Sequence, residues 1–333
     1  MAKIVLGIGM SHSPMMGLEG SKWNLFAEAD VKHPMLYDSE GNKVDYEDLE
    51  KKVGNQFEQD AQPDNLAKLS QEMENSFDRL YEDFKNAELD AVIVISNDHP
   101  NEWFDTSNVP ALGVFYGEEV ISGKVNFPPV FKFRPEVVQE MSRKMGMDDY
   151  NVWPGSKEIG EHLIVSLMDK GFDVAAMKEA KDPSTAGHGH GYGFVVTELM
   201  RDKLIPMVPV YLNSWPPNEL SPSRCYDLGI AIRKAIEELP GDLRIGVVAS
   251  GGLSHFVTDR DLDDLVIEAL KNRDEKTLRE LPRHRLKAGN SEIRNWVVLE
   301  AAIRNLAFDW HHYIPVFRTP VGTGIGMTFA RWS

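Results

Sequence analysis

The chain has 333 residues, 42% of them hydrophobic, which is enough to bury the core of one large domain or of two modest ones. Its formal net charge of −16 argues against nucleic acid as a partner, because binding to phosphates relies on clustered lysine and arginine side chains. A single cysteine, Cys225, excludes an internal disulfide and a thiolate cluster, so histidine and carboxylate side chains must hold any bound metal.

Two further features concern the location of the protein. The longest apolar runs are strand-sized and shorter than a membrane span, so we expect no membrane segment. The first residues enter a strand pattern directly, without the apolar region and cleavage site of a secretory signal. We therefore expect a cytoplasmic protein.

The N-terminal part of the chain predicts one strand and then an insertion. Residues 3–8 form a short β-branched run that opens into a loop containing His12. Residues 23–62 are polar and broken by proline and glycine, and residues 65–86 carry apolar side chains at the spacing of an amphipathic helix. We therefore expect a lid-like helical insertion over residues 15–86.

The rest of the chain alternates between strand and helix patterns. A continuously apolar run at residues 89–96 predicts a buried strand that ends in Asn97-Asp98-His99-Pro100. Further strands are expected at residues 111–116, 173–177, 207–212 and 244–249. Helices are expected at residues 135–145, 160–170, 221–238, 261–272 and 291–305. This alternation predicts an α/β fold in which helices flank a central mixed, largely parallel sheet. No repeat or composition break divides the chain, so we expect one domain over residues 1–333.

His12 and His99 are the first candidate functional residues because each follows a predicted strand. In open α/β sheets ligands bind outside the carboxyl ends of the strands, so the two imidazoles are expected to be neighbours. Glycine, serine and proline surround His12 in a tight turn, and Asp98 could fix the imidazole tautomer of His99. The alternatives are a turn histidine bonded to the backbone for His12 and a strand-terminating turn for His99.

The most unusual composition in the chain is the run GHGHGYG at residues 187–193. Glycine lets the backbone approach a ligand closely, and histidine transfers protons near neutral pH. His188 and His190 are therefore candidate catalytic residues, and a glycine-rich surface loop is the alternative. The histidines without companion signals, which are expected to have surface or packing roles, are His33, His162, His284, His311 and His312.

A third histidine-bearing turn, SGGLSHF at residues 250–256, follows another predicted strand. This turn could bring His255 to the same edge of the sheet as His12 and His99, or the Gly-Gly turn could simply support the site. Four acidic residues follow: Asp259, Asp261, Asp263 and Asp264. They are typical of the N-terminus of a helix, where the dipole favours negative charge, but one of them could face a metal instead.

Two histidines and one carboxylate with open coordination positions form the ligand set of non-haem Fe(II) enzymes that activate O₂. Zinc could occupy the same ligands in a hydrolase or lyase, with a bound water as the nucleophile. The residue types and spacing leave both possibilities open.

Four segments resemble, in order, the type III extradiol dioxygenases, the superfamily of the protocatechuate 4,5-dioxygenase β subunit: GMSHSP at residues 9–14, SNDH at 96–99, HG at 190–191 and SGGLSHF at 250–256. The likeness extends from residue 3 to about residue 327. Trp23 and the segment GNSEIRNW at residues 289–296 are similar to single-subunit 3-O-methylgallate and gallate dioxygenases.

The resemblance implies roles for several residues. His12 and His99 match the two histidines that bind Fe(II), and His190 matches the acid/base histidine beside the metal. The third ligand is a glutamate in the family, and its position falls on Asp261, with Asp259 as the reserve candidate. Aspartate can serve as the carboxylate of such a triad, but its side chain is one methylene shorter.

The implied reaction is extradiol cleavage by O₂ of a carboxylated catechol-type ring such as gallate, 3-O-methylgallate or protocatechuate. Ser291 and Asn290 match the region that contacts the substrate carboxylate, and His255 is expected with them. The acidic segment of residues 21–62 would cover the site as a small partner subunit does in two-subunit relatives, and a homodimer is a further expectation. The departure at Asp261 favours an alternative in which the protein is a non-catalytic small-molecule binder.

Overall fold

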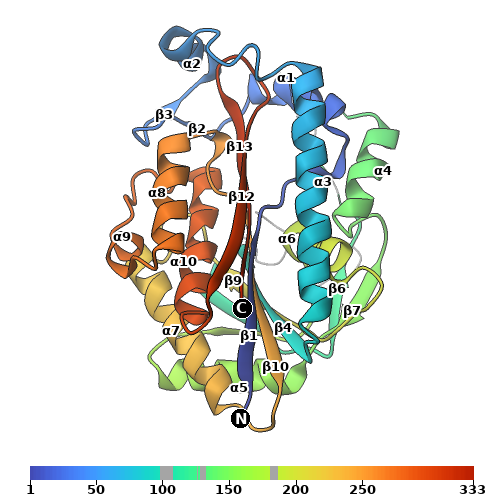
Figure 1. Cartoon of the computed structure of the whole chain (residues 1–333), viewed down its shortest axis with the longest axis vertical. Coiled ribbons are helices and arrows are strands. Elements are labelled where there is room, and N and C mark those ends of the chain that lie inside the picture. The colour runs from blue at the N-terminus through green and yellow to red at the C-terminus, as the bar shows by residue number, and fades with distance from the viewer. Residues whose placement is uncertain (98–107, 126, 128–132, 181–186) are drawn as a thin grey trace.

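The computed structural model describes residues 1–97, 108–125, 127, 133–180 and 187–333. In this part of the chain, helices cover both faces of a nine-stranded mixed sheet (Figure 1). The strands follow the order β11-β13-β1-β10-β4-β9-β5-β8, and β12 pairs with β13. The predicted α/β fold class is confirmed.

The strands of the central sheet are β1 (Lys3–Met10), β4 (Ala91–Asn97), β5 (Leu112–Phe115), β8 (Ala175–Met177), β9 (Met207–Leu212), β10 (Arg244–Ser250), β11 (His255–Val257), β12 (Phe308–Phe317) and β13 (Thr323–Trp332). Two small sheets pair β2 (Leu36–Tyr37) with β3 (Lys43–Val44) and β6 (Glu119–Ser122) with β7 (Asn151–Pro154).

The α-helices are α1 (Ala27–Asp30), α2 (Tyr46–Val53), α3 (Pro63–Asn86), α4 (Pro135–Lys144), α5 (Lys157–Asp169), α6 (His190–Phe194), α7 (Pro222–Glu238), α8 (Arg260–Lys271), α9 (Glu275–Arg279) and α10 (Ile293–Ala302). Short 3₁₀ helices are η1 (Pro14–Gly17), η2 (Gly20–Phe26) and η4 (Ala288–Glu292), and η3 (Val195–Met200) is a π-helix that continues α6.

The centre of the sheet is parallel and brings four strand ends to one edge. β1 pairs with β10, β10 with β4, and β4 with β9, all in parallel register. Met10 lies opposite Ser250, and Asn97 lies opposite Leu212, so the C-terminal ends of these strands line up. The loops that follow them therefore meet at this edge, where ligands bind in open α/β sheets.

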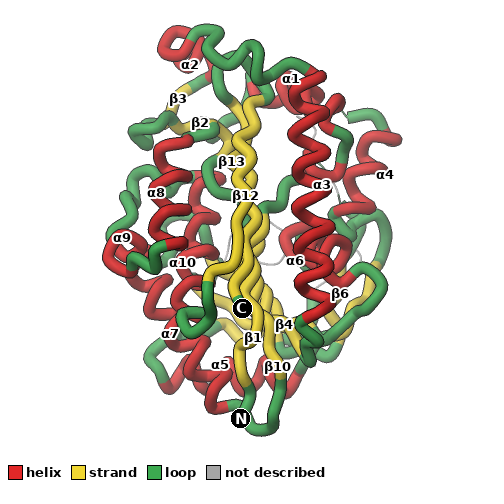
Figure 2. Tube along the Cα trace, viewed as in Figure 1, coloured by secondary structure: helices red, strands yellow, loops and turns green. Residues whose placement is uncertain are grey.

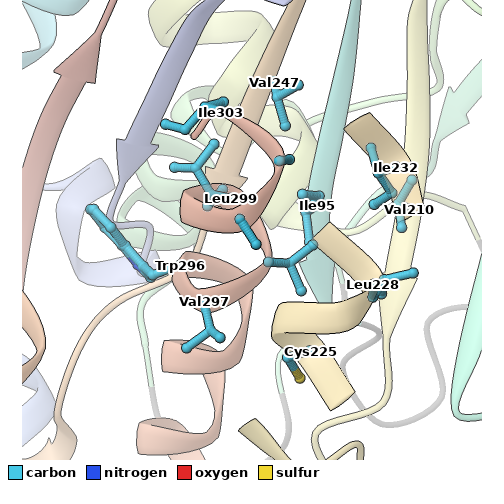
Figure 3. Close-up of a cluster of buried hydrophobic side chains, with 14 of the residues drawn as sticks. Ile95, Val210, Cys225, Leu228, Ile232, Val247, Trp296, Val297, Leu299 and Ile303 are labelled. Atoms are coloured by element: carbon cyan, nitrogen blue, oxygen red, sulfur yellow. The ribbon is translucent and has the colours of Figure 1, made fainter. Parts of the chain in front are cut away.

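Two hydrophobic layers sandwich the sheet. All seven residues of β4, from Ala91 to Asn97, are buried, as expected of a strand that is covered on both faces. Helices α7 and α10 pack against one face (Figure 3), where the labelled side chains are Ile95, Val210, Cys225, Leu228, Ile232, Val247, Trp296, Val297, Leu299 and Ile303. Helix α3 packs on the other face, through buried residues that include Met73, Phe77 and Leu80.

The predicted insertion over residues 15–86 corresponds to two separate parts of the structure. Helix α3 is part of the main fold, because its apolar face is buried against the sheet. The segment before it is made of short helices and loops around the tip of the β12–β13 hairpin (Figure 2). Phe57 stacks on Phe317 with ring centroids 4.0 Å apart, and its backbone N–H donates to Pro320 O. Only the segment before α3 therefore lies at the tip of the β12–β13 hairpin.

The long C-terminal hairpin was not predicted from the sequence. β12 and β13 pair along their whole length, and β13 also pairs with β1 and β11. β12 contains two histidines and Pro315, and β13 contains two glycines, so neither shows the alternation typical of a half-buried strand.

Among the helices that the structure describes, none is long and apolar enough to cross a membrane.

Candidate metal and active site

His12 lies just beyond the C-terminal end of β1, and its side chain is buried, with 2% of the residue exposed. Ser11 fixes the backbone immediately before it. The Ser11 N–H donates to Thr328 O, and the Ser11 hydroxyl accepts from the Thr328 N–H. The neighbouring strand β13 therefore sets where the loop leaves the sheet and where the imidazole of His12 lies.

The hydrogen bonds around Ser250 determine the tautomer of His12. The Ser250 hydroxyl has one proton and donates it to Gly191 O at 2.6 Å. Toward His12 Nδ1, 2.9 Å away, the same oxygen must therefore accept. Nδ1 thus carries the ring proton, and in the neutral imidazole the lone pair is on Nε2. A Cβ at Gly191 would lie 2.2 Å from the Ser96 hydroxyl and 2.9 Å from His12 Cε1, so glycine is required there.

The carboxylate that faces His12 belongs to Glu292. Its Oε1 lies 3.5 Å from His12 Nε2, and only 5% of the residue is exposed. The other oxygen, Oε2, accepts the Gly252 N–H at 2.8 Å and lies 3.6 Å from His255 Nε2. Burial opposes ionisation, yet the positive charges that His12 and His255 carry when protonated, with their hydrogen bonds, hold the pKa of Glu292 well below its usual range. The side chain is therefore a buried carboxylate at the centre of the site.

The turn at residues 251–255 acts as a backbone scaffold for this carboxylate. Each of its five amide groups donates to a defined acceptor, which in order are Met10 O, Glu292 Oε2, Gly326 O, Asp263 Oδ1 and Asn290 Oδ1. A turn with all its amides bonded has little freedom to shift. The position of Glu292 is thereby tied to the ends of β1 and β13.

His12 and Glu292 suit a divalent metal ion. When His12 is neutral, its Nε2 lone pair and the ionised carboxylate face each other, and two such acceptors need a proton or a metal ion between or beside them. Donors that each bind one ion at about 2.1 Å lie roughly 3 to 4 Å apart, and the separation of 3.5 Å falls in that range. The Ser250 hydroxyl also holds the other ring nitrogen, as partners of ligating histidines commonly do.

His190 lies directly beside His12. It begins α6, 8% of it is exposed, and its ring meets the ring of His12 edge to face with centroids 4.8 Å apart. The structure thus brings together the two histidines that were predicted as metal ligand and acid/base.

His188 lies in a packed aromatic cluster. Its Nδ1 donates to Ile121 O at 3.0 Å, and its ring lies against Phe115 and Tyr192 with centroids 4.7 and 5.6 Å away. Burial lowers the pKa of His188 to about 4, so the ring is neutral near pH 7. These contacts indicate a role in positioning the 187–193 loop.

The structure does not bring Asp261 or Asp259 to His12. Asp261 is exposed in the first turn of α8, where a negative charge favours the helix dipole. Asp259 is the N-cap of that helix and accepts the Leu262 N–H, and its other oxygen pairs with Arg285 at 2.6 Å. Both aspartates serve the helix terminus, and the carboxylate that faces His12 is that of Glu292.

Ser291 and Asn290 also differ from their expected role as substrate contacts. The Ser291 hydroxyl donates to Ala288 O within η4, and the residue is 1% exposed. The Asn290 side chain accepts the His255 N–H and donates to Arg285 O. Their polar groups hold the backbone around Glu292. His255 was expected near the substrate, and it lies at the edge of the centre, facing Glu292.

His99, the second expected ligand, lies outside the described residues. The strand that leads to it is described, and β4 ends at Asn97, beside the candidate centre. Asn295 Nδ2 donates to both Asn97 Oδ1 at 2.6 Å and Ser250 O at 3.0 Å. Among the described side chains, no three histidine, cysteine, aspartate or glutamate residues form a group that could hold a metal.

Sequence reasoning missed Glu292, although a signal was present. The residue lies in GNSEIRNWVVLEAA, and the structure buries every residue from Gly289 to Ala302. Charged side chains are almost never fully buried without a partner, so a glutamate at the start of such an apolar helix is a candidate functional residue. Counting residues from the SGGLSH turn drew attention to Asp261 instead.

A buried histidine and carboxylate at the C-terminal edge of a parallel sheet define an α/β protein with a candidate metal centre. Residues 57–327 match the family described as the catalytic LigB subunit of aromatic ring-opening dioxygenase. The chain belongs to this family, and it contains a ring-opening dioxygenase domain.

Individual relatives are more distant. Gallate dioxygenase from Pseudomonas putida is 27% identical over 163 residues, a match that covers 45% of this chain and 46% of that protein. The chain thus matches less than half the length of this curated relative. Among solved structures, the uncharacterized protein JW3007 from Escherichia coli K12 has a TM-score of 0.44 at 15% identity, over 77% of this chain and 92% of that chain.

Proposed function

We propose that the protein is an Fe(II)-dependent extradiol dioxygenase that opens a carboxylated catechol-type ring with O₂. The observation that carries the proposal is the pair formed by His12 Nε2 and Glu292 Oε1, 3.5 Å apart and buried at the sheet edge. Membership of the ring-opening dioxygenase family supports the reaction class. The match to a gallate dioxygenase supports a substrate of the gallate and protocatechuate kind.

His12 and Glu292 would hold the iron, with His99 proposed as the third ligand. Two histidines and one carboxylate on one side of an Fe(II) ion are the ligand set of enzymes that activate O₂. When bound, the iron would bind the substrate oxygens and O₂ and pass electrons from the aromatic ring, which is oxidised, to O₂.

The chain itself would orient the ligands and move protons. Ser250 fixes the tautomer of His12, and the Gly252 N–H holds the carboxylate of Glu292. His190, whose ring meets that of His12, is positioned to accept a proton from a substrate hydroxyl and to return it later. The low exposure of these side chains limits the access of water to the site.

The test combines metal binding with oxygen consumption. Protein loaded anaerobically with Fe(II) should consume O₂ when protocatechuate, gallate or 3-O-methylgallate is added in an oxygen electrode. Full occupancy by zinc, with no O₂ consumption after iron reconstitution, would overturn the proposal and favour a hydrolase or lyase.

The carboxylate ligand can be tested separately by measuring bound iron after anaerobic gel filtration. Glu292→Gln should weaken iron binding by at least about tenfold, because even residues that only support a ligand cause losses of that size. Asp261→Asn is the matched control and should bind iron like the wild type. The opposite result would return the ligand role to Asp261.

A further inference from the structure

His33 is placed at the edge of the candidate centre by the segment that precedes α3. Its ring lies on Phe256 with centroids 3.9 Å apart and an interplanar angle of 42°. The residue before Phe256 is His255, whose Nε2 lies 3.6 Å from Glu292 Oε2. A histidine from a different part of the chain thus borders the site.

A buried ion pair anchors this segment three residues before His33. Arg318 binds Asp30 through two hydrogen bonds, Nε to Oδ2 at 2.6 Å and Nη2 to Oδ1 at 2.7 Å. The Thr323 hydroxyl donates to Asp30 Oδ2 as well. The His33 N–H then donates to Asp30 O, so the imidazole is carried on a backbone that is fixed to the β12–β13 hairpin.

The tautomer and charge of His33 make it a hydrogen-bond donor. The Met35 N–H donates to His33 Nδ1 at 3.2 Å, so Nδ1 holds the lone pair and the proton is on Nε2. Burial lowers the pKa of His33 to about 4, and Arg318 and His255 add to this effect against the attraction of Asp30. In the part of the chain that the structure describes, His33 Nε2 has no hydrogen-bond partner, and the ring is partly exposed.

The residues first expected to bind a substrate carboxylate are committed elsewhere. The Ser291 hydroxyl is bonded to Ala288 O, and both ends of the Asn290 amide are bonded to backbone. Arg318, the nearby cation, already holds Asp30 through two hydrogen bonds. These groups are therefore already engaged within the protein, and His33 is a donor on another element that borders the site.

We propose that His33 is a specificity-determining residue that donates its Nε2–H to the carboxylate of the aromatic substrate, with Phe256 beside it. The inference rests on the proposed function, because it assumes that the ring oxygens reach the centre at His12 and Glu292. It assigns the recognition of the substituent to the N-terminal segment, and the chemistry to the sheet edge.

The experiment measures binding by isothermal titration calorimetry without O₂, so that no turnover occurs. Protocatechuate and catechol, which differ only in the carboxylate, are titrated into Fe(II)-loaded wild type, His33→Phe and His33→Gln. His33→Phe keeps a ring on Phe256 and removes the donor, whereas His33→Gln restores an N–H close to the Nε2 position. Thermal unfolding and iron content show whether each variant is folded and loaded.

We expect His33→Phe to weaken protocatechuate binding about three- to tenfold, the value of one hydrogen bond, and to change catechol binding less than twofold. His33→Gln should recover most of the loss. An equal loss for both ligands would show that His33 only packs, and unchanged protocatechuate binding in His33→Phe would also overturn the inference. A wild type that binds neither ligand would overturn the proposed function and the inference with it.

Discussion

Individual side chains at the sheet edge have separable roles, and His190 is the clearest case. Its ring lies edge to face against the ring of His12, and it matches the acid/base histidine of the family that the sequence resembles, so we expect it to move protons and not to hold the metal. His188, two residues earlier, is bonded to Ile121 O and packed among aromatic rings. The two histidines of one short loop thus offer a matched pair for mutation.

We predict that His190→Phe retains iron and lowers kcat about 10²- to 10⁴-fold, the usual contribution of a general acid/base. His188→Asn keeps a donor for Ile121 O and should stay within a few fold of wild-type activity. Iron content and initial rates of O₂ consumption check both. Wild-type turnover in His190→Phe would refute its acid/base role.

Asp263 is a buried carboxyl that supports the 251–255 turn from behind. It accepts hydrogen bonds from the Ser254 N–H, the Ser254 hydroxyl and the Tyr313 hydroxyl, each at 2.7 Å. Burial raises the pKa of Asp263 to about 7. The hydrogen bonds lower the pKa, but the loss of water around the carboxylate raises it by more. The group is 0% exposed, so this shift belongs to the folded state.

The raised pKa of Asp263 predicts how stability changes with pH. The folded state holds this proton up to about pH 7, whereas the unfolded state releases it near pH 4, so stability falls as pH rises between these values, by at most about 4 kcal/mol. Asp263→Asn should remove this part of the decline. Urea unfolding from pH 4 to pH 8 measures it, with Asp261→Asn, exposed on the same helix, as the control. Identical slopes in all three proteins would contradict the prediction.

At the scale of elements, β1 and α10 are in unusually close contact. Trp296 of α10 lies across β1 where a Cβ on Gly9 would be 2.0 Å from its ring, and its Nε1 donates to Gly251 O. This contact places η4, and therefore Glu292, against the end of β1. Close packing of these two elements is thus a condition for the site.

Gly9→Ala should therefore destabilise the fold by about 1 to 3 kcal/mol or more, as overpacking of a filled core does. Gly7→Ala is the matched control, because the atom it would meet is the flexible end of Ile303, 2.5 Å away. We expect a smaller loss there. Chemical denaturation of both variants gives the comparison, and a larger loss at Gly7 would contradict the packing argument.

At the scale of the whole molecule, the ends of the chain are joined by the Asp30–Arg318 pair. The two residues are separated by 288 positions, and both side chains are almost completely buried. Thr323 adds a third hydrogen bond to the same carboxylate. The pair therefore holds the N-terminal segment on the C-terminal hairpin and, with it, His33 at the site.

Asp30→Asn should cost about 3 to 5 kcal/mol, because it leaves the Arg318 charge buried without its partner. Limited proteolysis should then cleave faster within residues 27–57 than in the sheet. Lys52→Ala is the control, since that lysine pairs with Asp38 but is 47% exposed, and such pairs contribute at most about 1 kcal/mol. Equal protease resistance in wild type and Asp30→Asn would contradict this anchoring role.

Local pattern was sufficient to predict most elements of the fold. The continuous apolar runs at β4 and β10 and the helical spacing in α3 and α7 come from residues close in sequence, so they can be read without the tertiary structure. The hairpin β12–β13 could not be predicted in this way, because its strands are buried by distant elements, β1 and α3. Polar residues and glycines are tolerated in a strand wherever a neighbouring element covers them, so the local pattern is lost.

The sequence by itself determined the fold class, the loop that carries His12 and the proton-transfer candidate His190. Only the tertiary structure decided that Glu292, and not Asp261, faces His12, and that His33 lies on Phe256, next to the residue that faces Glu292. The reason is physical: a metal-binding or substrate-binding group is defined by where side chains from distant segments meet. Spacing along the chain determines helix faces and strand ends, but it does not determine which of several acidic residues is turned inward at a sheet edge.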